Sequence, residues 1–373
     1  MAQLNFLKSL NIGDSSPKLP LIQGGMGVGI SLSGLAAAVA NEGGIGVIAT
    51  AGIGMTEPDF NTDFLGANIR ALRKELRKAR ELTKGVLGVN IMTALSNFSD
   101  MARTSIEEGV DIIFSGAGLP LNLPQFLGKN SKTKLVPIVS SARAAGIIFK
   151  KWIEKYNYLP DAVVVEGPLA GGHLGFKREQ IADPDYSLEK LIPQVVTEVN
   201  RYEEKHRRAI PVIAAGGVYS GADINRFMQL GATGVQMATR FITTDECDAS
   251  LQFKETFLGI KQEDLVIIKS PVGLLGRAIH NKFIADVAMG KKKPFRCPFH
   301  CITTCDYQNS PYCIALALFN AYKGRLKHGF AFSGANAYRA TEITSVRKLI
   351  GSLFTEAAGQ TKETANERNR KDQ

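Results

Sequence analysis

The sequence predicts a (β/α)8 barrel (TIM barrel), an α/β fold in which eight parallel strands alternate with helices. Eight short runs rich in Val, Ile, Ala and Gly are continuous rather than alternating, as expected of strands buried on both faces. Segments of helical period separate most of these runs, and this order implies parallel βαβ units. Eight such units in 373 residues favour a closed barrel over a doubly wound open sheet, which remains the alternative.

The predicted strands and helices follow one another from the N-terminal region to residue 241. The strand runs are Leu19–Met26, Gly44–Thr50, Gly85–Met92, Val110–Gly116, Lys134–Ser141, Asp161–Pro168, Ile210–Val218 and Gly234–Phe241. The helical segments are Leu32–Asn41, Asp59–Thr83, Asn97–Glu108, Ala142–Tyr156, Ser187–Arg207 and Ala222–Leu230. The connection after the fourth run is shorter and shows no clear helix.

The pattern changes after the eighth run, which we interpret as a layer added to the barrel. Leu251–Ile260 has helical spacing, and Leu265–Ser270 has the composition of a short strand. Helical spacing returns in Ile314–Lys323 and Thr341–Leu353. The last stretch, Gln360–Gln373, is polar and charged without an apolar period, and this composition predicts a frayed tail.

Composition and charge exclude several classes of protein. The chain has 45 basic and 35 acidic residues, a formal charge of +10, and 45% apolar residues. No apolar run approaches about 20 residues and no signal-peptide core is present, so we expect a cytoplasmic protein with no membrane partner. No nucleic-acid motif accompanies the basic residues, and we therefore attribute them to solvated helix faces and a phosphate-bearing ligand.

The carboxyl ends of the predicted strands carry glycine-rich and polar segments. These segments are Gln23-Gly24-Gly25-Met26-Gly27, Asn90, Ser115-Gly116-Ala117-Gly118, Ala214-Ala215-Gly216-Gly217 and Met237-Ala238-Thr239-Arg240. In a parallel barrel this edge collects the functional loops, and the loops after strands 7 and 8 often hold a phosphate. Glycines there also make ordinary tight turns, but two such loops at the phosphate positions favour a phosphorylated cofactor.

One histidine stands out because of its surroundings. His173 follows Ala170-Gly171-Gly172 after the sixth run, where it would face the barrel mouth. An imidazole in that place can take or give a proton near neutral pH, although a loop histidine taken alone is more often a surface residue. His173 is therefore the predicted catalytic residue. The other four histidines have weaker claims and are His206, His280, His300 and His328.

Taken together, these motifs resemble those of the nitronate monooxygenase (2-nitropropane dioxygenase) family, which also contains flavin-dependent enoyl-ACP reductases. The resemblance spans roughly residues 19 to 340 in order. The segments that carry it are Gln23-Gly24-Gly25-Met26-Gly27, Ala170-Gly171-Gly172-His173, Ala214-Ala215-Gly216-Gly217, Leu230-Gly231-Ala232 and Val235-Gln236-Met237-Ala238-Thr239-Arg240-Phe241. Each glycine motif is common by itself, whereas the ordered set is specific.

The resemblance implies an FMN-binding barrel with a smaller lid domain inserted after the eighth strand. On this basis we expect residues 1–243 and 328–358 to form the barrel, 244–327 the lid, and 359–373 a disordered tail. The residues expected to contact FMN are Gln23, Gly24, Gly25, Met26, Asn90 and Gly172 near the ring, and Gly216, Gly217, Ala238 and Thr239 at the phosphate. His173 matches the family's active-site histidine. In two places the chain departs from the family, which often has an acidic residue at Leu169 and a glycine at Ala238.

The resemblance implies two activities, and the sequence does not choose between them. The first is oxidation of alkyl nitronates with dioxygen, and the second is reduction of an enoyl thioester with NAD(P)H. Either would act on a small-molecule substrate, and a basic surface would attract an acidic carrier protein or coenzyme A. A metal-sensing or scaffold protein with a disused barrel is a third, non-enzymatic hypothesis. Nothing in the sequence determines the oligomeric state, and a homodimer is one alternative.

Four of the five cysteines fall within seventeen residues, at Cys297, Cys301, Cys305 and Cys313. Such clustering in a cytoplasmic chain indicates a metal site more than disulfides. If the segment were helical, its four-residue steps would place the first three thiols on one face. Thiolates suit an iron–sulfur cluster or zinc, and the lack of a Cys-x2-Cys pair speaks against a zinc ribbon. An iron–sulfur cluster, zinc and free thiols all remain open.

Overall fold

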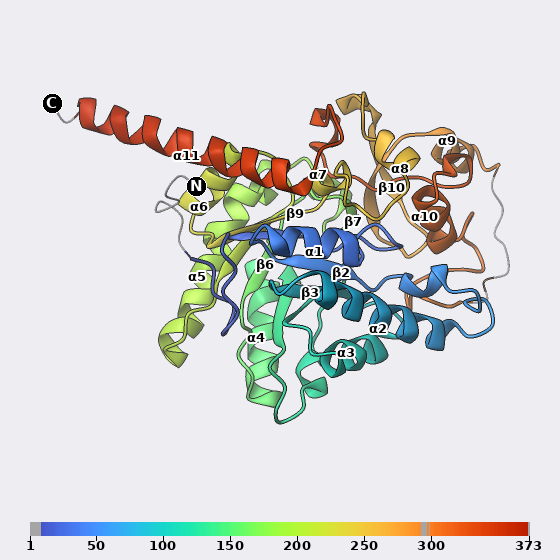
Figure 1. Cartoon of the computed structure of the whole chain (residues 1–373), viewed down its shortest axis with the longest axis horizontal. Coiled ribbons are helices and arrows are strands. Elements are labelled where there is room, and N and C mark those ends of the chain that lie inside the picture. Colours follow the sequence, from blue (N-terminus) through green and yellow to red (C-terminus); the bar gives the residue numbers. More distant parts are fainter. Residues whose placement is uncertain (1–8, 292–296, 298, 372–373) are drawn as a thin grey trace.

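The computed structural model describes residues 9–291, 297 and 299–371, and its centre is a sheet of eight parallel strands (Figure 1). The sheet order is β1-β9-β8-β6-β5-β4-β3-β2. The strands are β1 (Leu21–Gln23), β2 (Gly46–Ala49), β3 (Leu87–Met92), β4 (Ile112–Gly116), β5 (Lys134–Val139), β6 (Val163–Glu166), β8 (Val212–Ala215) and β9 (Gly234–Met237). Every predicted run contains one of them.

The two ends of this order meet and close the barrel. Ile22 of β1 and Ile45, just before β2, form a parallel bridge. The Ile45 backbone N–H donates to Leu21 O over 2.9 Å, and Gln23 N–H donates to Ile45 O over 2.9 Å. The (β/α)8 prediction is confirmed, and the open-sheet alternative is wrong.

Helices surround the barrel in the predicted order. They are α1 (Ser33–Asn41), α2 (Phe64–Leu82), α3 (Phe98–Glu107), α4 (Ala142–Tyr156), α5 (Leu188–His206) and α6 (Gly221–Gln229). The connection after β4 holds only a short 3-10 turn, Leu123–Phe126, as its length suggested. Ser141 and Ser220 cap α4 and α6 by accepting backbone N–H groups with their hydroxyls, which explains why those helices begin where they do.

The last helix, α11 (Val346–Lys371), returns to the barrel and packs between α6 and α1. Gly221 N–H at the start of α6 donates to Glu356 Oε2 over 2.9 Å, and Arg347 Nε donates to Glu42 Oε1 over 3.0 Å. A methyl group on Gly221 would lie 2.4 Å from Leu353 O, so this contact requires glycine. The backbone is helical to Lys371, whereas the sequence predicts disorder in 359–373. The disordered tail and the domain boundaries stay predictions.

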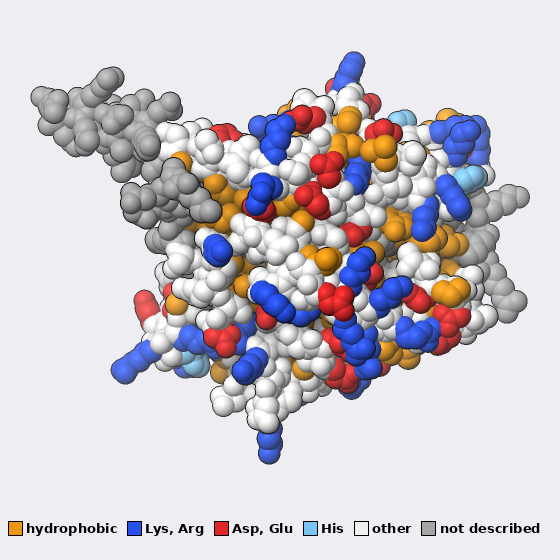
Figure 2. All heavy atoms as spheres, viewed as in Figure 1, with side chains coloured by type: hydrophobic (Ala, Val, Ile, Leu, Met, Phe, Trp, Pro, Cys, Tyr) orange, Lys and Arg blue, Asp and Glu red, His pale blue; other side chains and the backbone are white. Residues whose placement is uncertain are grey.

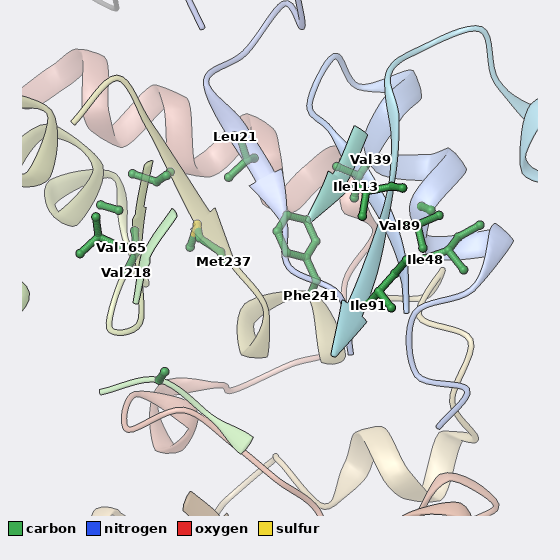
Figure 3. Packing of buried hydrophobic residues seen from close by; sticks show 14 of the residues in the cluster. Leu21, Val39, Ile48, Val89, Ile91, Ile113, Val165, Val218, Met237 and Phe241 are labelled. Atoms are coloured by element: carbon green, nitrogen blue, oxygen red, sulfur yellow. The ribbon is translucent and has the colours of Figure 1, made fainter. Parts of the chain in front are cut away.

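Strand residues divide between two layers of core, as the two-residue period of a strand requires. Ile112 and Phe114 of β4 point into the barrel, while Ile113 points out toward the helices. Figure 3 shows Ile113 in the outer cluster, with Val89 and Ile91 of β3. The inner cluster also takes in Leu10 and Ile12, which close the amino end of the barrel. Only the carboxyl end is left for a ligand.

A second, antiparallel sheet covers the carboxyl end of the barrel. It consists of β10 (Leu265–Lys269), β11 (Leu275–Ile279) and β7 (Gly172–Leu174), in the order β10-β11-β7. Three helices accompany it, namely α8 (Leu251–Glu255), α9 (Lys282–Ala288) and α10 (Ile314–Tyr322). β10 was predicted, whereas β7, β11 and α9 were not. Because β7 belongs to the loop after β6, this sheet joins the barrel segment to the added layer.

Several predicted boundaries are shifted for local reasons. The eighth run was extended to Phe241, but β9 ends at Met237 and the short helix α7 (Thr239–Ile242) follows. The helix predicted over Leu251–Ile260 ends at Glu255. Gly259, four residues later, has a φ of +76°, a conformation that glycine adopts readily. The helix predicted from Thr341 begins at Val346, because Thr344 instead pairs with Thr244 in a parallel bridge.

The basic side chains of α2 are balanced by acidic neighbours. Arg70 pairs with Asp59 and Asp63, and Arg77 places its guanidinium 2.7 Å from Glu108 Oε1. Figure 2 shows Lys and Arg interspersed with Asp and Glu over the face it presents. These exposed pairs agree with the interpretation of the excess charge as solvated helix faces. Within the described residues, no helix combines the length and hydropathy needed to cross a bilayer.

Candidate functional site

A cavity of about 980 Å³ opens at the carboxyl end of the barrel. One wall is formed by strand ends and the loops that follow them, and the opposite wall by β7, the turn between β10 and β11, the segment around Cys301, and α10. All of the predicted cofactor residues except Gln23 line this cavity, as does His173. The structure therefore brings together residues between 24 and 239 whose proximity was only predicted from the sequence.

The first glycine segment lies close to the main chain and side chains beside it. Gly24 N–H donates to Met237 O over 2.9 Å, which fixes the loop against β9. A methyl group on Gly25 would lie 2.4 Å from Asn90 Cβ, so only glycine fits there. Gln23 is fully buried beneath the cavity, where its side chain donates to Gly24 O and accepts from Val47 N–H. Gln23 supports the loop and does not line the cavity.

The second glycine segment follows β8 and has the backbone of an anion-binding loop. Gly216 and Gly217 have φ values of +82° and +111°, which side-chain-bearing residues rarely adopt. Asn336 Nδ2 donates to Gly217 O over 2.8 Å. Thr239 Oγ1 accepts from Gly334 N–H over 2.8 Å, which joins the end of β9 to the returning segment before α11. This loop, with Ala238 and Thr239, surrounds one end of the cavity.

Polar groups without partners gather at that same end. The Ser333 hydroxyl is buried with no hydrogen-bond partner among the described residues, and it lines the cavity. Tyr219 also lines the cavity, and the guanidinium carbons of Arg240 and Arg339 lie 4.7 and 4.4 Å from the centroid of its ring. A buried hydroxyl is costly unless it is hydrogen-bonded. Positive charge and an unused hydroxyl beside two glycine loops fit a phosphate group.

Three polar side chains face the barrel axis at the floor of the cavity. Asn90, Glu166 and Gln236 line it, and pairing of Glu166 and Gln236 with the same residue, Ala215, places those two at one level. Burial raises the pKa of Glu166 to about 7, with no charged neighbour to offset it. Barrel interiors are normally filled by apolar side chains. A polar floor therefore fits a ligand that hydrogen-bonds to it, such as the sugar-alcohol chain or the ring edge of FMN.

Glu166 and Gln236 were missed by the sequence analysis. Glu166 was counted only as part of an apolar strand run, and Gln236 was quoted in a motif that carries the family resemblance but was given no role. The available signal was position, because Glu166 lies two residues after the inward-facing Val164 and so points to the same side of the strand. A charged residue at the inward-facing end of a barrel strand indicates a site rather than packing.

His173 lies on β7, opposite Gly276 of β11, and not in a flexible loop. Its Nε2 is 2.9 Å from Ser270 Oγ, and its ring packs edge-on against Phe332 with centroids 5.1 Å apart. Burial lowers the pKa of His173 to about 4, so the imidazole is neutral at physiological pH. A neutral imidazole held in this way can accept a proton or a hydrogen bond inside the cavity.

Arg277 of β11 holds the loop that leads to His173. Its buried guanidinium donates to Pro168 O over 2.8 Å and to Ala170 O over 2.5 Å. Burial lowers the pKa of Arg277 to about 10, which still leaves the side chain charged at neutral pH. Leu169, between the two carbonyls, is 44% exposed and faces the cavity. A side chain at this position therefore lies at an exposed part of the cavity wall, its mouth.

The clustered cysteines lie in the wall opposite the barrel. The described residues from Cys297 to Cys305 form no helix, so the helical face considered for the first three thiols does not occur; they have one bridge at Ile302 and a turn at Thr303 and Thr304. His300 has a φ of +45°, in the left-handed region that few residues other than glycine adopt. No disulfide joins any of them, and within the described residues no three His, Cys, Asp or Glu side chains are arranged around a single ion. The predicted metal stays a prediction.

Comparison with known proteins places the chain in one family. The family model described as nitronate monooxygenase matches residues 9–356. A "Probable nitronate monooxygenase" of Staphylococcus aureus (strain Newman) is 29% identical over 298 residues, which are 73% of this chain and 78% of that protein. A protein of the same name from Staphylococcus saprophyticus is 29% identical over 293 residues, 72% of this chain and 77% of its own.

Two solved structures are similar over nearly the whole length. FabK from Thermotoga maritima has a TM-score of 0.71 and 27% identity, covering 94% of this chain and 96% of its own. A nitroalkane oxidase from Streptomyces ansochromogenes has a TM-score of 0.70, covering 93% and 98%, but at 20% identity it shows a shared fold alone. Because the family match extends over the barrel, the loops around the cavity and the second sheet, the chain belongs to the nitronate monooxygenase family of oxidoreductases.

Proposed function

We propose that the protein is an FMN-dependent oxidoreductase that oxidises alkyl nitronates with dioxygen. The observation that carries this proposal is the position of a neutral imidazole, His173, in the same cavity as the two glycine loops and the unpartnered Ser333 hydroxyl. Family membership supports the choice of chemistry. Bound FMN would supply one-electron oxidation of the substrate and transfer of the electron to dioxygen.

The chain's own residues have separate tasks in this proposal. Gly216, Gly217, Ala238, Thr239 and Ser333 would hold the phosphate, and the backbone of Gly24 to Met26 would pass beside the ring. With a nitronate, which has already lost the acidic proton on the carbon next to nitrogen, neutral His173 would hydrogen-bond to the nitro oxygens. With a neutral nitroalkane it would accept that proton. Its low pKa keeps the imidazole neutral at physiological pH, so a ring nitrogen is free to make this contact. The apolar side chains of the lid wall would keep bulk water out.

Oxygen consumption tests the proposal directly. Flavin-loaded protein should consume dioxygen when propionate 3-nitronate or the anion of nitroethane is added, with release of nitrite. The same protein without added nitronate provides the background rate. Absence of consumption from fully flavin-loaded protein with both compounds would remove this function.

Reduction of an enoyl thioester with NAD(P)H is the second candidate. The cavity of about 980 Å³ would have to hold both FMN and the substrate, and the family resemblance that implies nitronate oxidation implies this reaction as well. Under this alternative, NADH or NADPH should bleach the flavin without air, and a crotonyl thioester should then be turned over. If the protein oxidises nitronates alone, neither bleaching of the flavin by NADH or NADPH nor turnover of the thioester is expected. The cytoplasmic location and a homodimer remain predictions of the sequence.

A further inference from the structure

We propose that Cys297, Cys301, Cys305 and Cys313 together bind a thiophilic metal centre in the wall of the flavin cavity. This inference concerns the lid wall and does not depend on which substrate is used. It goes beyond the clustering in the sequence because four thiols on separate turns have been brought to one place by the fold. Three observations support it, and they are independent of one another.

The first observation is that all four thiols line a single small pocket. Cys297, Cys301, Cys305 and Cys313 face it together with aromatic rings, among them Tyr307 and Tyr312. Each of the six pairs of thiols is close enough to interact electrostatically. These four soft donors converge on one small pocket lined by apolar and aromatic side chains, and converging thiols of this kind are the ligands that a thiophilic metal prefers.

The second observation is that backbone contacts, rather than the thiols themselves, hold this arrangement. Leu95, in the loop after β3, forms an antiparallel bridge with Ile302, and Ser96 N–H donates to Cys301 O over 3.1 Å. On the other side, Asp306 N–H donates to Pro271 O over 3.2 Å. The turns that carry the cysteines are therefore fixed to the barrel and to the second sheet before any ligand arrives.

The third observation concerns Cys313, which occupies the N-cap position of α10 and makes no side-chain capping hydrogen bond there. The amino end of a helix favours negative charge, so this position favours a thiolate over a thiol. The thiolate is the form of cysteine that binds a soft metal.

Four thiols are the donor set of two kinds of soft-metal centre. In the described part of the chain no three His, Cys, Asp or Glu side chains form a group that could hold a single ion. A single zinc ion requires four sulfurs each about 2.3 Å from it. An iron–sulfur cluster accepts the same four thiolates at wider separations, because its own atoms fill the space between them. Both occupants share the chemistry of a soft metal held by thiolates.

The pocket shares a wall with the flavin cavity. Cys301, Ile302 and Ile314 line both spaces, so a centre held by Cys301 would lie one side chain away from the larger cavity. Cys297 and Cys301 also pack against the apolar cluster of Phe60 and Phe299, which borders that cavity. A redox-active centre at this position would be a second electron carrier beside the flavin.

Metal analysis of the full-length protein, purified without air, tests the inference. Iron together with acid-labile sulfide supports the site and identifies a cluster, and one zinc per chain supports it as a structural centre. Protein that holds neither metal after purification, and takes up neither when supplied with ferrous iron and sulfide or with zinc, overturns the inference. Flavin content is measured on the same samples, so a failed metal site and a failed flavoenzyme give different results.

Substitutions locate the site. Cys301→Ser and Cys305→Ser should each lose most of the metal while keeping FMN, because the flavin loops lie in the other wall. Cys247→Ala is the matched control, since Cys247 is also a buried, unpaired cysteine but lies outside the pocket. Full metal content in both serine variants, or equal loss in Cys247→Ala, would count against the assignment. If Cys301→Ser does not fold, Cys305, which is less deeply buried, still gives the answer.

Discussion

The two walls of the cavity differ in how the chain builds them. The barrel wall consists of strand ends, whose positions follow from the hydrogen-bonded register of the whole sheet. The lid wall is assembled from β7, the β10–β11 turn and the segment around Cys301, held to one another by a few specific contacts such as those of Arg277. A rigid wall suits a permanently bound cofactor, and an assembled wall suits the groups that meet the substrate.

The strongest test of this contrast is removal of the one imidazole from the lid wall. We expect His173→Ala to lower turnover by about 10²–10⁴-fold, the usual contribution of a general acid–base group. FMN content should stay close to one per chain, because the phosphate loops are untouched. Steady-state kinetics and the flavin absorption spectrum measure the two effects on one sample. Loss of flavin along with activity would show that His173 supports the fold instead.

A substitution in the barrel wall should instead weaken flavin binding. Gly216→Ala places a methyl group 2.7 Å from Gly167 O in a backbone conformation with a φ of +82°. Such a conformation costs a side-chain-bearing residue about 1–2 kcal/mol, so flavin affinity should fall by about tenfold or more. The measurement is flavin retained after dialysis. Gly351→Ala is the control, because that glycine lies exposed on α11 with nothing near its Cβ, and flavin binding should not change.

The two walls also respond oppositely to pH in the flavin-free protein. Burial raises the pKa of Glu166 from 4.5 to about 7, so the folded state binds the extra proton and stability falls as pH rises between those values. Burial lowers the pKa of His173 from 6.5 to about 4, so the unfolded state binds the extra proton and stability rises with pH in that window. Between about pH 4.5 and 6.5 these two contributions to the pH dependence of stability therefore largely cancel.

Substituting either Glu166 or His173 reveals the pH dependence of stability that the other residue contributes. Glu166→Gln should leave a melting temperature that rises from pH 4.5 to 6.5, and His173→Ala one that falls from pH 4.5 to 7. The Glu166 contribution is at most about 3 kcal/mol over its window. Thermal unfolding at a series of pH values measures both variants. Parallel profiles for the two variants and the unchanged protein would contradict the assigned shifts.

The barrel wall could be predicted from the sequence, and the lid wall could not. Continuous apolar runs determine strands buried on both faces, and glycines at their ends mark the loops, so Gly25 and Gly216 were found. β7 has no strand pattern of its own in Gly172-His173-Leu174 and becomes a strand only because β11, a hundred residues later, pairs with it. Glu166 was hidden for a different reason, since its role depends on which way one residue of a recognised strand points.

The cysteines lie between these cases. Their clustering predicted one site, and the fold brings them to one pocket, although the described residues around the first three form no helix. Four-residue steps place side chains on one face only when the segment is helical. Here the bridge between Leu95 and Ile302 ties the segment to a loop about two hundred residues earlier. Convergence of the thiols therefore depends on long-range contacts that spacing does not encode.

A smaller effect is expected from the contact that joins the two walls. Arg277→Met removes both hydrogen bonds to Pro168 O and Ala170 O while keeping most of the side-chain volume. A buried carbonyl left without its donor costs about 1–3 kcal/mol, so the protein should unfold at lower denaturant concentration. Because β7 follows directly, KM should rise more than kcat falls. An unchanged KM would mean that β7 is held by its pairing with β11 alone.

The smallest expected effect distinguishes the two candidate substrates. Leu169→Glu places a carboxylate at the cavity mouth, where 44% exposure keeps the charge solvated and its interactions near 1 kcal/mol. A nitronate is an anion, so its KM should rise by up to about fivefold, and added salt should reduce the rise. Leu169→Gln has the same shape without the charge and should leave KM near its original value. An enoyl thioester of coenzyme A or of an acidic carrier protein is also anionic, so the comparison uses a thioester of a small uncharged thiol, whose KM should respond alike to both variants. If the KM for the nitronate rises equally in Leu169→Glu and Leu169→Gln, the charge of the substrate does not matter at this position, and the nitronate loses support as the substrate.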